Sequence, residues 1–93
     1  MAEIDETTVI TLSPVASFQS LGESAVILII DSGQLYTCNE TTEAFLKAVD
    51  GVRSLAEIID AVLPEFEVDR ETLRTDLLSL AADLTTQGII TAT

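Results

Sequence analysis

Hydrophobic and polar positions in the first half of the chain fall into short runs that are typical of β-strands. Residues 9–12 (VITL) form the first run, which a Ser-Pro pair stops, and residues 15–24 are interpreted as an irregular link. Residues 26–30 (VILII) and residues 35–38 (LYTC) form two further runs. Between these two, residues 31–34 (DSGQ) have turn chemistry, with a glycine that accepts positive φ, and predict a β-hairpin.

After the hairpin, the apolar residues take helical spacing. Asn39 suits the N-cap of a first helix, because its side chain can accept an otherwise unpaired backbone N–H. Ser54 and Glu57 have the spacing of a capping box for a second helix, which Pro64 stops. The apolar positions of these two helices are Phe45, Leu46, Val49, Leu55, Ile58, Ile59 and Val62.

A third helix is predicted to run from Asp69, which can cap it, to about Gln87. Val68 can pack on Leu73 as a hydrophobic staple at its start, and Gly88 ends it. The two isoleucines that follow either fall back on the core or add a short strand.

The order of these elements predicts an α+β fold. We expect an N-terminal three-stranded antiparallel sheet followed by a three-helix bundle, with the helices covering one face of the sheet. The 93 residues fit a single domain, 1–93, in which the polar residues 1–8 are expected to be flexible.

The charge balance narrows the possible partners. Sixteen acidic and four basic residues give a formal net charge of −12, and the chain has no His. Nucleic-acid binding is disfavoured, because it depends on neutralising phosphates. A basic peptide or protein fits better, although acidity that serves only solubility is the alternative. The start of the chain does not resemble a signal peptide, and its apolar runs are too short to span a membrane. We therefore expect a cytoplasmic protein.

The sequence offers little catalytic chemistry. Without His, imidazole catalysis and most zinc sites are excluded. Cys38 has no His partner, so we interpret it as a small apolar residue that points inward. The triplet Asp31-Ser32-Gly33 lies in a turn rather than at a helix start, which disfavours a carrier function. We expect no enzyme activity, cofactor or metal.

The strand at residues 35–38 is predicted to lie at an edge of the sheet. It contains no Lys, Pro or inward charge, the features that usually protect such an edge from pairing with another chain. Coverage by a loop or by the C-terminal tail is the alternative.

The third helix, at about 100° per residue, carries a leucine stripe that is mostly core. The stripe consists of Leu73, Leu77, Leu80 and Leu84. One flank carries Arg74, Leu78 and Ala81, and the other carries Asp76 and Asp83. If this helix lies beside the free strand edge, the two form a groove to which an extended peptide can add as a further strand.

Several short motifs stand in a fixed order between residues 33 and 90. They are Cys38-Asn39, Asp50-Gly51, Ser54, Val68-Asp69, Glu71, Leu73, Asp76 and Gly88-Ile89-Ile90. In order and spacing this segment resembles the PqqD-like family, also called RiPP recognition elements. Cys38 stands where the family usually has Leu, and a small apolar group still fits an inward position.

The resemblance implies a fold related to winged helix-turn-helix proteins, and binding of the leader segment of a ribosomally made precursor peptide. The leader would add to the third strand and contact the third helix. The implied site residues are Leu35, Tyr36, Thr37, Cys38, Leu73, Arg74, Asp76, Leu77, Leu78 and Leu80. The chain is most similar to the leader-binding component of a lasso-peptide pathway, which presents the precursor to a leader peptidase and a macrocyclase.

Two further interpretations remain, and the second of them is compatible with leader binding. The helix order also permits a winged-helix nucleic-acid-binding regulator, which the charge opposes. The other interpretation is that the chain is a subunit that completes an enzyme elsewhere. It would dock through the outer face of the sheet, because residues 26–30 are apolar at both inward and outward positions.

Overall fold

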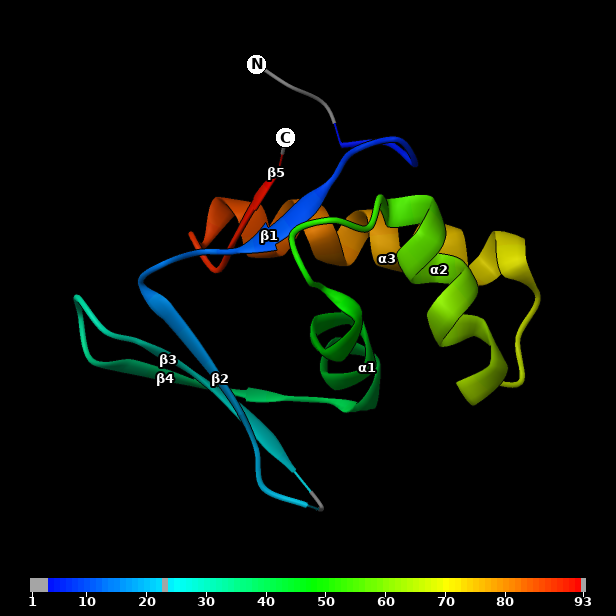
Figure 1. Ribbon diagram of the computed structural model, residues 1–93. Coiled ribbons are helices and arrows are strands. Elements are labelled where there is room, and N and C mark those ends of the chain that lie inside the picture. The colour runs from blue at the N-terminus through cyan, green and yellow to red at the C-terminus, as the bar shows by residue number, and fades with distance from the viewer. Residues whose placement is uncertain (1–3, 23, 93) are drawn as a thin grey trace.

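The computed structural model describes residues 4–22 and 24–92 (Figure 1). The strands are β1 (Ile10–Leu12), β2 (Ala16–Ser20), β3 (Ala25–Ile29), β4 (Gln34–Cys38) and β5 (Ile90–Ala92). The helices are α1 (Glu40–Ala48), α2 (Leu55–Val62) and α3 (Arg70–Thr86), with a short 3-10 helix, η1 (Leu63–Glu65), after α2. The predicted α+β class, with a hairpin followed by three helices, is confirmed.

The strands form two antiparallel sheets, where we predicted one. The larger sheet has the order β2-β3-β4, and the smaller one pairs β1 with β5. The prediction that residues 9–12 join the hairpin is wrong, because this strand pairs with the C-terminal end of the chain, with Leu12 opposite Ile90. The prediction of an irregular link at residues 15–24 is also wrong, since β2 takes the place beside β3.

The weak pattern of β2 explains this error. Its inward positions are Ala16 and Phe18, and its outward positions are Ser17 and Gln19, so the alternation expected of a half-buried strand is present. Alanine contributes only a methyl group and is depleted in strands. The pairing with β3, which only the folded chain provides, decides the structure of this segment.

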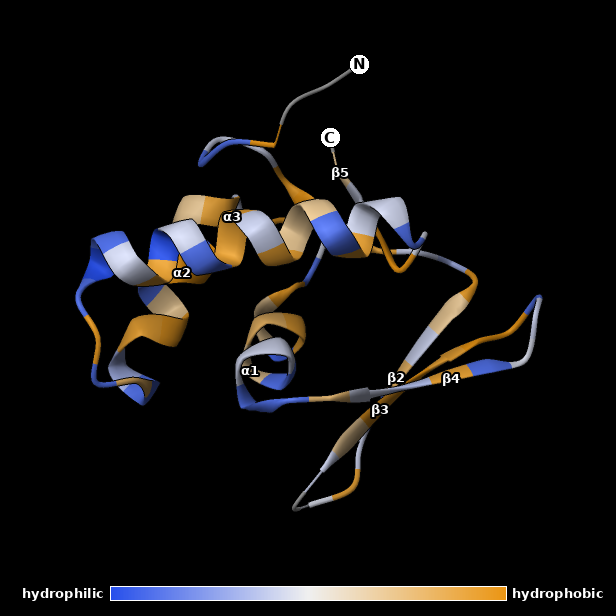
Figure 2. Cartoon of the chain, turned by 180° about the vertical axis from the view of Figure 1, so that it is seen from behind, coloured by the Kyte–Doolittle hydropathy of each residue, from blue (hydrophilic) through white to orange (hydrophobic). Residues whose placement is uncertain are grey.

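The core lies between the inner face of the larger sheet, the helices and the small sheet. Its largest fully buried side chains are Phe45, Ile10, Ile27, Leu55, Ile58, Ile59, Leu77, Ile89, Ile90 and Val62. Ile89 and Ile90 were expected either to pack on the core or to add a short strand. Both side chains are buried in the core, and Ile90 also begins β5. Figure 2 shows the hydrophobic stretches of β3 and the helices.

The predicted helix ends are largely confirmed. The Asn39 side chain accepts the backbone N–H of Thr42 at 2.8 Å, and Ser54 and Glu57 make both hydrogen bonds of the capping box. Asp69 does occupy the N-cap position of α3, but its carboxylate accepts the hydroxyl of Thr72 and no backbone N–H.

The N-terminal segment, expected to be flexible over residues 1–8, makes specific hydrogen bonds from Asp5 onward; residues 1–3 lie outside the described part. Leu55 N–H donates to the Thr8 carbonyl at 2.8 Å, and Ala56 N–H donates to the Glu6 carbonyl at 2.9 Å. The first-turn N–H groups of a helix have no partner within the helix. This segment therefore completes the cap of α2.

Candidate functional site

The strand β4 lies at one edge of the larger sheet, as predicted. Its sequence, QLYTC, contains no charge and no proline, and it leads directly into α1. The C-terminal strand β5 pairs with β1. Over the described residues, the C-terminal tail therefore leaves β4 uncovered, and one side of β4 has no strand partner.

The hydrogen-bond phase of the sheet shows which backbone groups point outward from this edge. Ile30, the residue after β3, donates its N–H to the Val15 carbonyl, so its backbone groups point toward β2. Backbone groups alternate in direction along a strand, and Ile29, whose carbonyl accepts the Gly33 N–H, therefore bonds toward β4. In the register of β3 with β4, Leu35 and Thr37 then direct their N–H and C=O groups away from the sheet.

The side chains of β4 divide between its two faces. Tyr36 and Cys38 are partly buried against the core, whereas Leu35 and Thr37 are exposed. The Tyr36 hydroxyl donates to Gln34 Oε1 at 3.2 Å. Burial, and secondarily the nearby Glu43 carboxylate, raises the pKa of the Cys38 thiol. That shift disfavours the thiolate, which is the nucleophilic form, so Cys38 has the character of a packing residue.

The predicted residues of α3 have different environments. Leu73 and Leu77 are fully buried, so they can support a binding wall from beneath but present no surface themselves. Leu78 and Leu80 are partly buried at the two margins of the helix, and Asp76 is exposed. The buried stripe is completed by Ala81, which the sequence analysis placed on a flank, and Leu80 is displaced to a margin.

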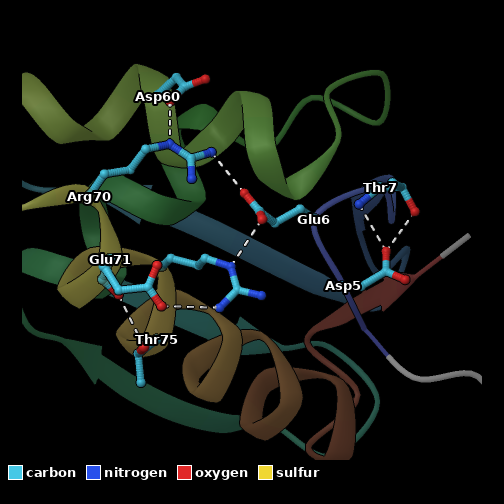
Figure 3. A network of polar contacts seen from close by, with 8 residues as sticks. Asp5, Glu6, Thr7, Asp60, Arg70, Glu71 and Thr75 are labelled. Atoms are coloured by element: carbon cyan, nitrogen blue, oxygen red, sulfur yellow. Dashed lines mark hydrogen bonds and ion pairs between the residues drawn. The ribbon is translucent and has the colours of Figure 1, made fainter.

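Arg74 is already engaged within the protein. Its Nε donates to Glu6 Oε2 at 3.0 Å, and its Nη1 lies 3.6 Å from Glu71 Oε1. The other oxygen of Glu6 accepts Arg70 Nη2 at 2.8 Å, while Arg70 Nε donates to Asp60 at 2.9 Å (Figure 3). Glu6 was missed by the sequence analysis, and no local pattern indicates it, because it is 64 and 68 residues away from its partners.

The predicted site residues come from two separate elements, β4 and α3. Figure 2 shows the N-terminal segment above α3, and α1 and β4 below it. In both views (Figures 1 and 2), β4 thus lies on the side of α3 that is away from the N-terminal segment. The individual site residues remain predictions.

The surface also has an open pocket at α1 and η1. A cavity of about 240 Å³ is lined by Glu40, Glu43, Ala44, Lys47, Glu65 and Phe66. Within residues 4–22 and 24–92, no group of three potential ligands is placed to hold a metal ion. In the same part of the chain, no helix has the length and hydropathy needed to cross a membrane.

Two solved structures share this fold. One is described as TbiB1 in complex with the TbiA(beta) leader peptide, with a TM-score of 0.78 and 20% identity over 86% of this chain and 93% of that one. The other is described as lasso peptide synthetase B1 complexed with the leader peptide, with a TM-score of 0.77 and 23% identity over 89% and 98% of the two chains.

Comparison with the curated proteins gives no match to this chain. The sequence profile of the family described as coenzyme PQQ synthesis protein D (PqqD) matches residues 24–90. The match begins just before β3 and ends at the start of β5, so it includes β4 and all three helices. This chain belongs to the PqqD family.

Proposed function

We propose that this chain is a non-catalytic adaptor that binds the leader segment of a ribosomally synthesised precursor peptide by strand addition to β4. It presents that leader, in the cytoplasm, to a leader peptidase and a macrocyclase of lasso-type biosynthesis. Family membership supports this proposal, as do the leader peptides in the two structures of the same fold. The relation to winged helix-turn-helix folds remains part of the proposal.

The unpaired edge of β4 is the observation that carries the proposal. Leu35 and Thr37 each offer one outward N–H and one outward C=O, with the spacing that a β-strand partner requires. A leader that pairs with these groups would gain affinity from the main chain, whatever its side chains. Its residues opposite Tyr36 and Cys38 would point to the inner side of the sheet, toward the helices, and would supply specificity.

In this arrangement α3 forms the second wall. Leu73 and Leu77 hold the helix in place from the core. The helix has two margins, one with Asp76 and Leu80 and the other with Arg74 and Leu78, and the leader side chains contact one of them.

The outer face of the larger sheet is a suitable docking surface for a processing enzyme. None of the residues of β2, β3 and β4 is charged, although the chain has a net charge of −12. On this face Leu28 lies directly opposite Leu35, and their exposed fractions are 38% and 62%. Exposed apolar surface of this kind is typical of protein contacts, and we propose that the leader peptidase docks here.

The rival interpretation as a nucleic-acid-binding regulator has little support. All four basic residues are ion-paired with carboxylates of the same chain. Within residues 4–22 and 24–92, no basic side chain is left without a carboxylate partner, which disfavours neutralisation of phosphates. A gel-shift assay with duplex DNA at low salt decides the point, since a shift would favour the regulator.

The test of the proposed function is calorimetric titration of the purified protein with the leader peptide of a precursor encoded beside it. Thr37→Pro removes an outward N–H of β4 and should weaken binding at least about tenfold, because a proline cannot donate at that position. Ser20→Pro removes an outward N–H from the opposite edge, on β2, and should bind as the wild type does.

Amide exchange provides an independent check. The N–H groups of Leu35 and Thr37 should exchange fast in the free protein and slowly in the complex, whereas that of Tyr36 should be protected in both. Slow exchange of Leu35 and Thr37 without the peptide, or equal affinity of Thr37→Pro and the wild type, would contradict strand addition at this edge.

A further inference from the structure

We propose that the flank of α3 formed by Asp76, Leu80 and Asp83 is the specificity wall of the leader site, and that it selects leaders with a Lys or Arg beside the strand-adding segment. The inference rests on the proposed function and assigns one of the two flanks of α3, which the sequence left open. Arg74 and Leu78, on the other flank, are then excluded from the contact.

The flank that carries Arg74 is covered by the N-terminal segment. Arg74 and Arg70 both bind the carboxylate of Glu6, at 3.0 and 2.8 Å. The backbone of the same segment is fixed to the first turn of α2 by the Glu6 and Thr8 carbonyls. Figure 3 shows Glu6 approaching Arg70 from the N-terminal segment, so this side of α3 is occupied by the protein itself.

Helical geometry places the proposed wall on the opposite side. At about 100° per residue, Asp76 is turned by about 200° from Arg74, and Asp83, nine positions on, by about 180°. Figures 1 and 2 show the N-terminal segment above α3 and the larger sheet below it, in views from opposite sides. The flank of Asp76 and Asp83 therefore faces the side of the molecule on which β4 lies.

This flank keeps its negative charge. Lys47, Arg53, Arg70 and Arg74 are the four basic residues of the chain. Each forms its ion pairs with carboxylates other than Asp76 and Asp83. Over the described residues, the two aspartates have no ion-pair partner and are exposed, with the partly buried Leu80 between them.

The chemistry of this wall fits a long cationic side chain. A leader residue opposite Tyr36 or Cys38 points to the inner side of the sheet, toward the helices. The methylene stem of a Lys or Arg at such a position can lie on Leu80, while its charged end stays in water near Asp76 or Asp83. An acidic residue there would meet two like charges, so the wall also rejects acidic leaders.

Selection from a phage-displayed library of random peptides tests the wall without a known leader. We expect peptides selected by the wild-type protein to be enriched in Lys and Arg, and to lose binding to Thr37→Pro. The double variant Asp76→Asn/Asp83→Asn should select peptides without that enrichment, and should bind the wild-type peptides about two- to tenfold more weakly. The control Glu67→Gln removes one charge in the loop before α3 and should keep the enrichment.

The outcomes separate the inference from the proposed function. Peptides that lose binding to Thr37→Pro but show no enrichment in Lys and Arg would contradict the proposed specificity wall and leave strand addition intact. Selected peptides that bind Thr37→Pro equally well would overturn the proposed function itself. Basic enrichment that persists in the double variant would show that the preference arises elsewhere.

A matched pair of leucine truncations tests which flank of α3 contacts the peptide, without changing any charge. Leu80→Ala and Leu78→Ala remove the same atoms from two partly buried positions of α3. Leu80→Ala should weaken a selected peptide by about tenfold, and Leu78→Ala by less than about twofold, with both variants folded by circular dichroism. The reverse order would assign the leader to the Arg74 flank and contradict the inference.

Discussion

Glu6 and Arg74 are 68 residues apart in the sequence, yet the Glu6 carboxylate accepts the Arg74 Nε–H at 3.0 Å. The same carboxylate accepts Arg70 Nη2, so one residue of the N-terminal segment holds the first two turns of α3. The segment also caps α2 through its backbone. Glu6 is therefore a link between the chain start and the two helices that support the candidate site.

Replacing Glu6 by Gln should lower the melting temperature by a few degrees and change its pH dependence. Hydrogen bonds from Arg70, and then from Arg74, hold the pKa of Glu6 below its ordinary value of 4.5. A carboxyl group with a lowered pKa in the folded state stabilises the protein above its unfolded pKa, and this contribution is lost as the pH falls through the folded pKa. The wild type should thus lose more stability than Glu6→Gln below about pH 4.5.

Thermal melts of both proteins across the acidic range measure this difference, with Glu67→Gln as the control for a lost surface charge. Parallel curves for Glu6→Gln and the wild type would show that the ion pairs with α3 contribute nothing measurable to stability, a common result for exposed pairs.

Replacing Ser54 by Ala should destabilise the protein by about 1 kcal/mol, because it removes the side chain that accepts the Glu57 N–H at 3.3 Å. The Leu55 and Ala56 N–H groups would keep their partners in the N-terminal segment, which limits the loss. Urea denaturation of the variant measures the change. Ser79→Ala, at an exposed position inside α3, should be neutral or slightly stabilising, since Ala favours helices.

Local signals were enough to predict the elements on either side of the candidate binding edge. Asn39, Ser54 and Gly88 mark helix ends through chemistry confined to a few neighbouring residues, and the structure has helix ends at each of them. The hairpin of β3 and β4 depends on a short turn in the same way. The edge position of β4 also requires that β5 pairs with β1 and not with β4, which these local signals do not show.

Features that depend on distant parts of the chain could not be predicted. The partner of β1 is β5, at the other end of the sequence, and no local pattern specifies that pairing. The rotation of α3 depends on what it packs against, so Ala81 is buried while the larger Leu80 is displaced to a margin. The same holds for Arg74, whose partner is the remote Glu6.

Replacing Leu28 by Gln should separate leader binding from enzyme docking. Leu28 lies on the outer face of the sheet, opposite Leu35 and Ser17, and does not belong to the proposed leader-binding edge. The fold should lose no more than about 1 kcal/mol, the scale of one cross-strand pair. Leader affinity should stay within about twofold of the wild type, since the main-chain groups of Leu35 and Thr37 are unchanged.

Co-purification with the leader peptidase of the same pathway should fall for Leu28→Gln, because an uncompensated amide would replace apolar contact. Ser17→Ala changes the neighbouring position without adding polarity and should leave co-purification unchanged. Loss of leader binding together with docking would instead show that the substitution perturbs β4 itself.

Raising the salt concentration should weaken the binding of a leader that carries Lys, and by more for the wild type than for Asp76→Asn/Asp83→Asn. The Debye length falls from about 10 Å at 0.1 M to about 3 Å at 1 M salt, so attraction between exposed charges is largely screened. Hydrogen bonds to the edge of β4 carry no net charge and should persist. Titration across this range gives the slope for both proteins, and a flat wild-type response would contradict the electrostatic contribution while leaving strand addition in place.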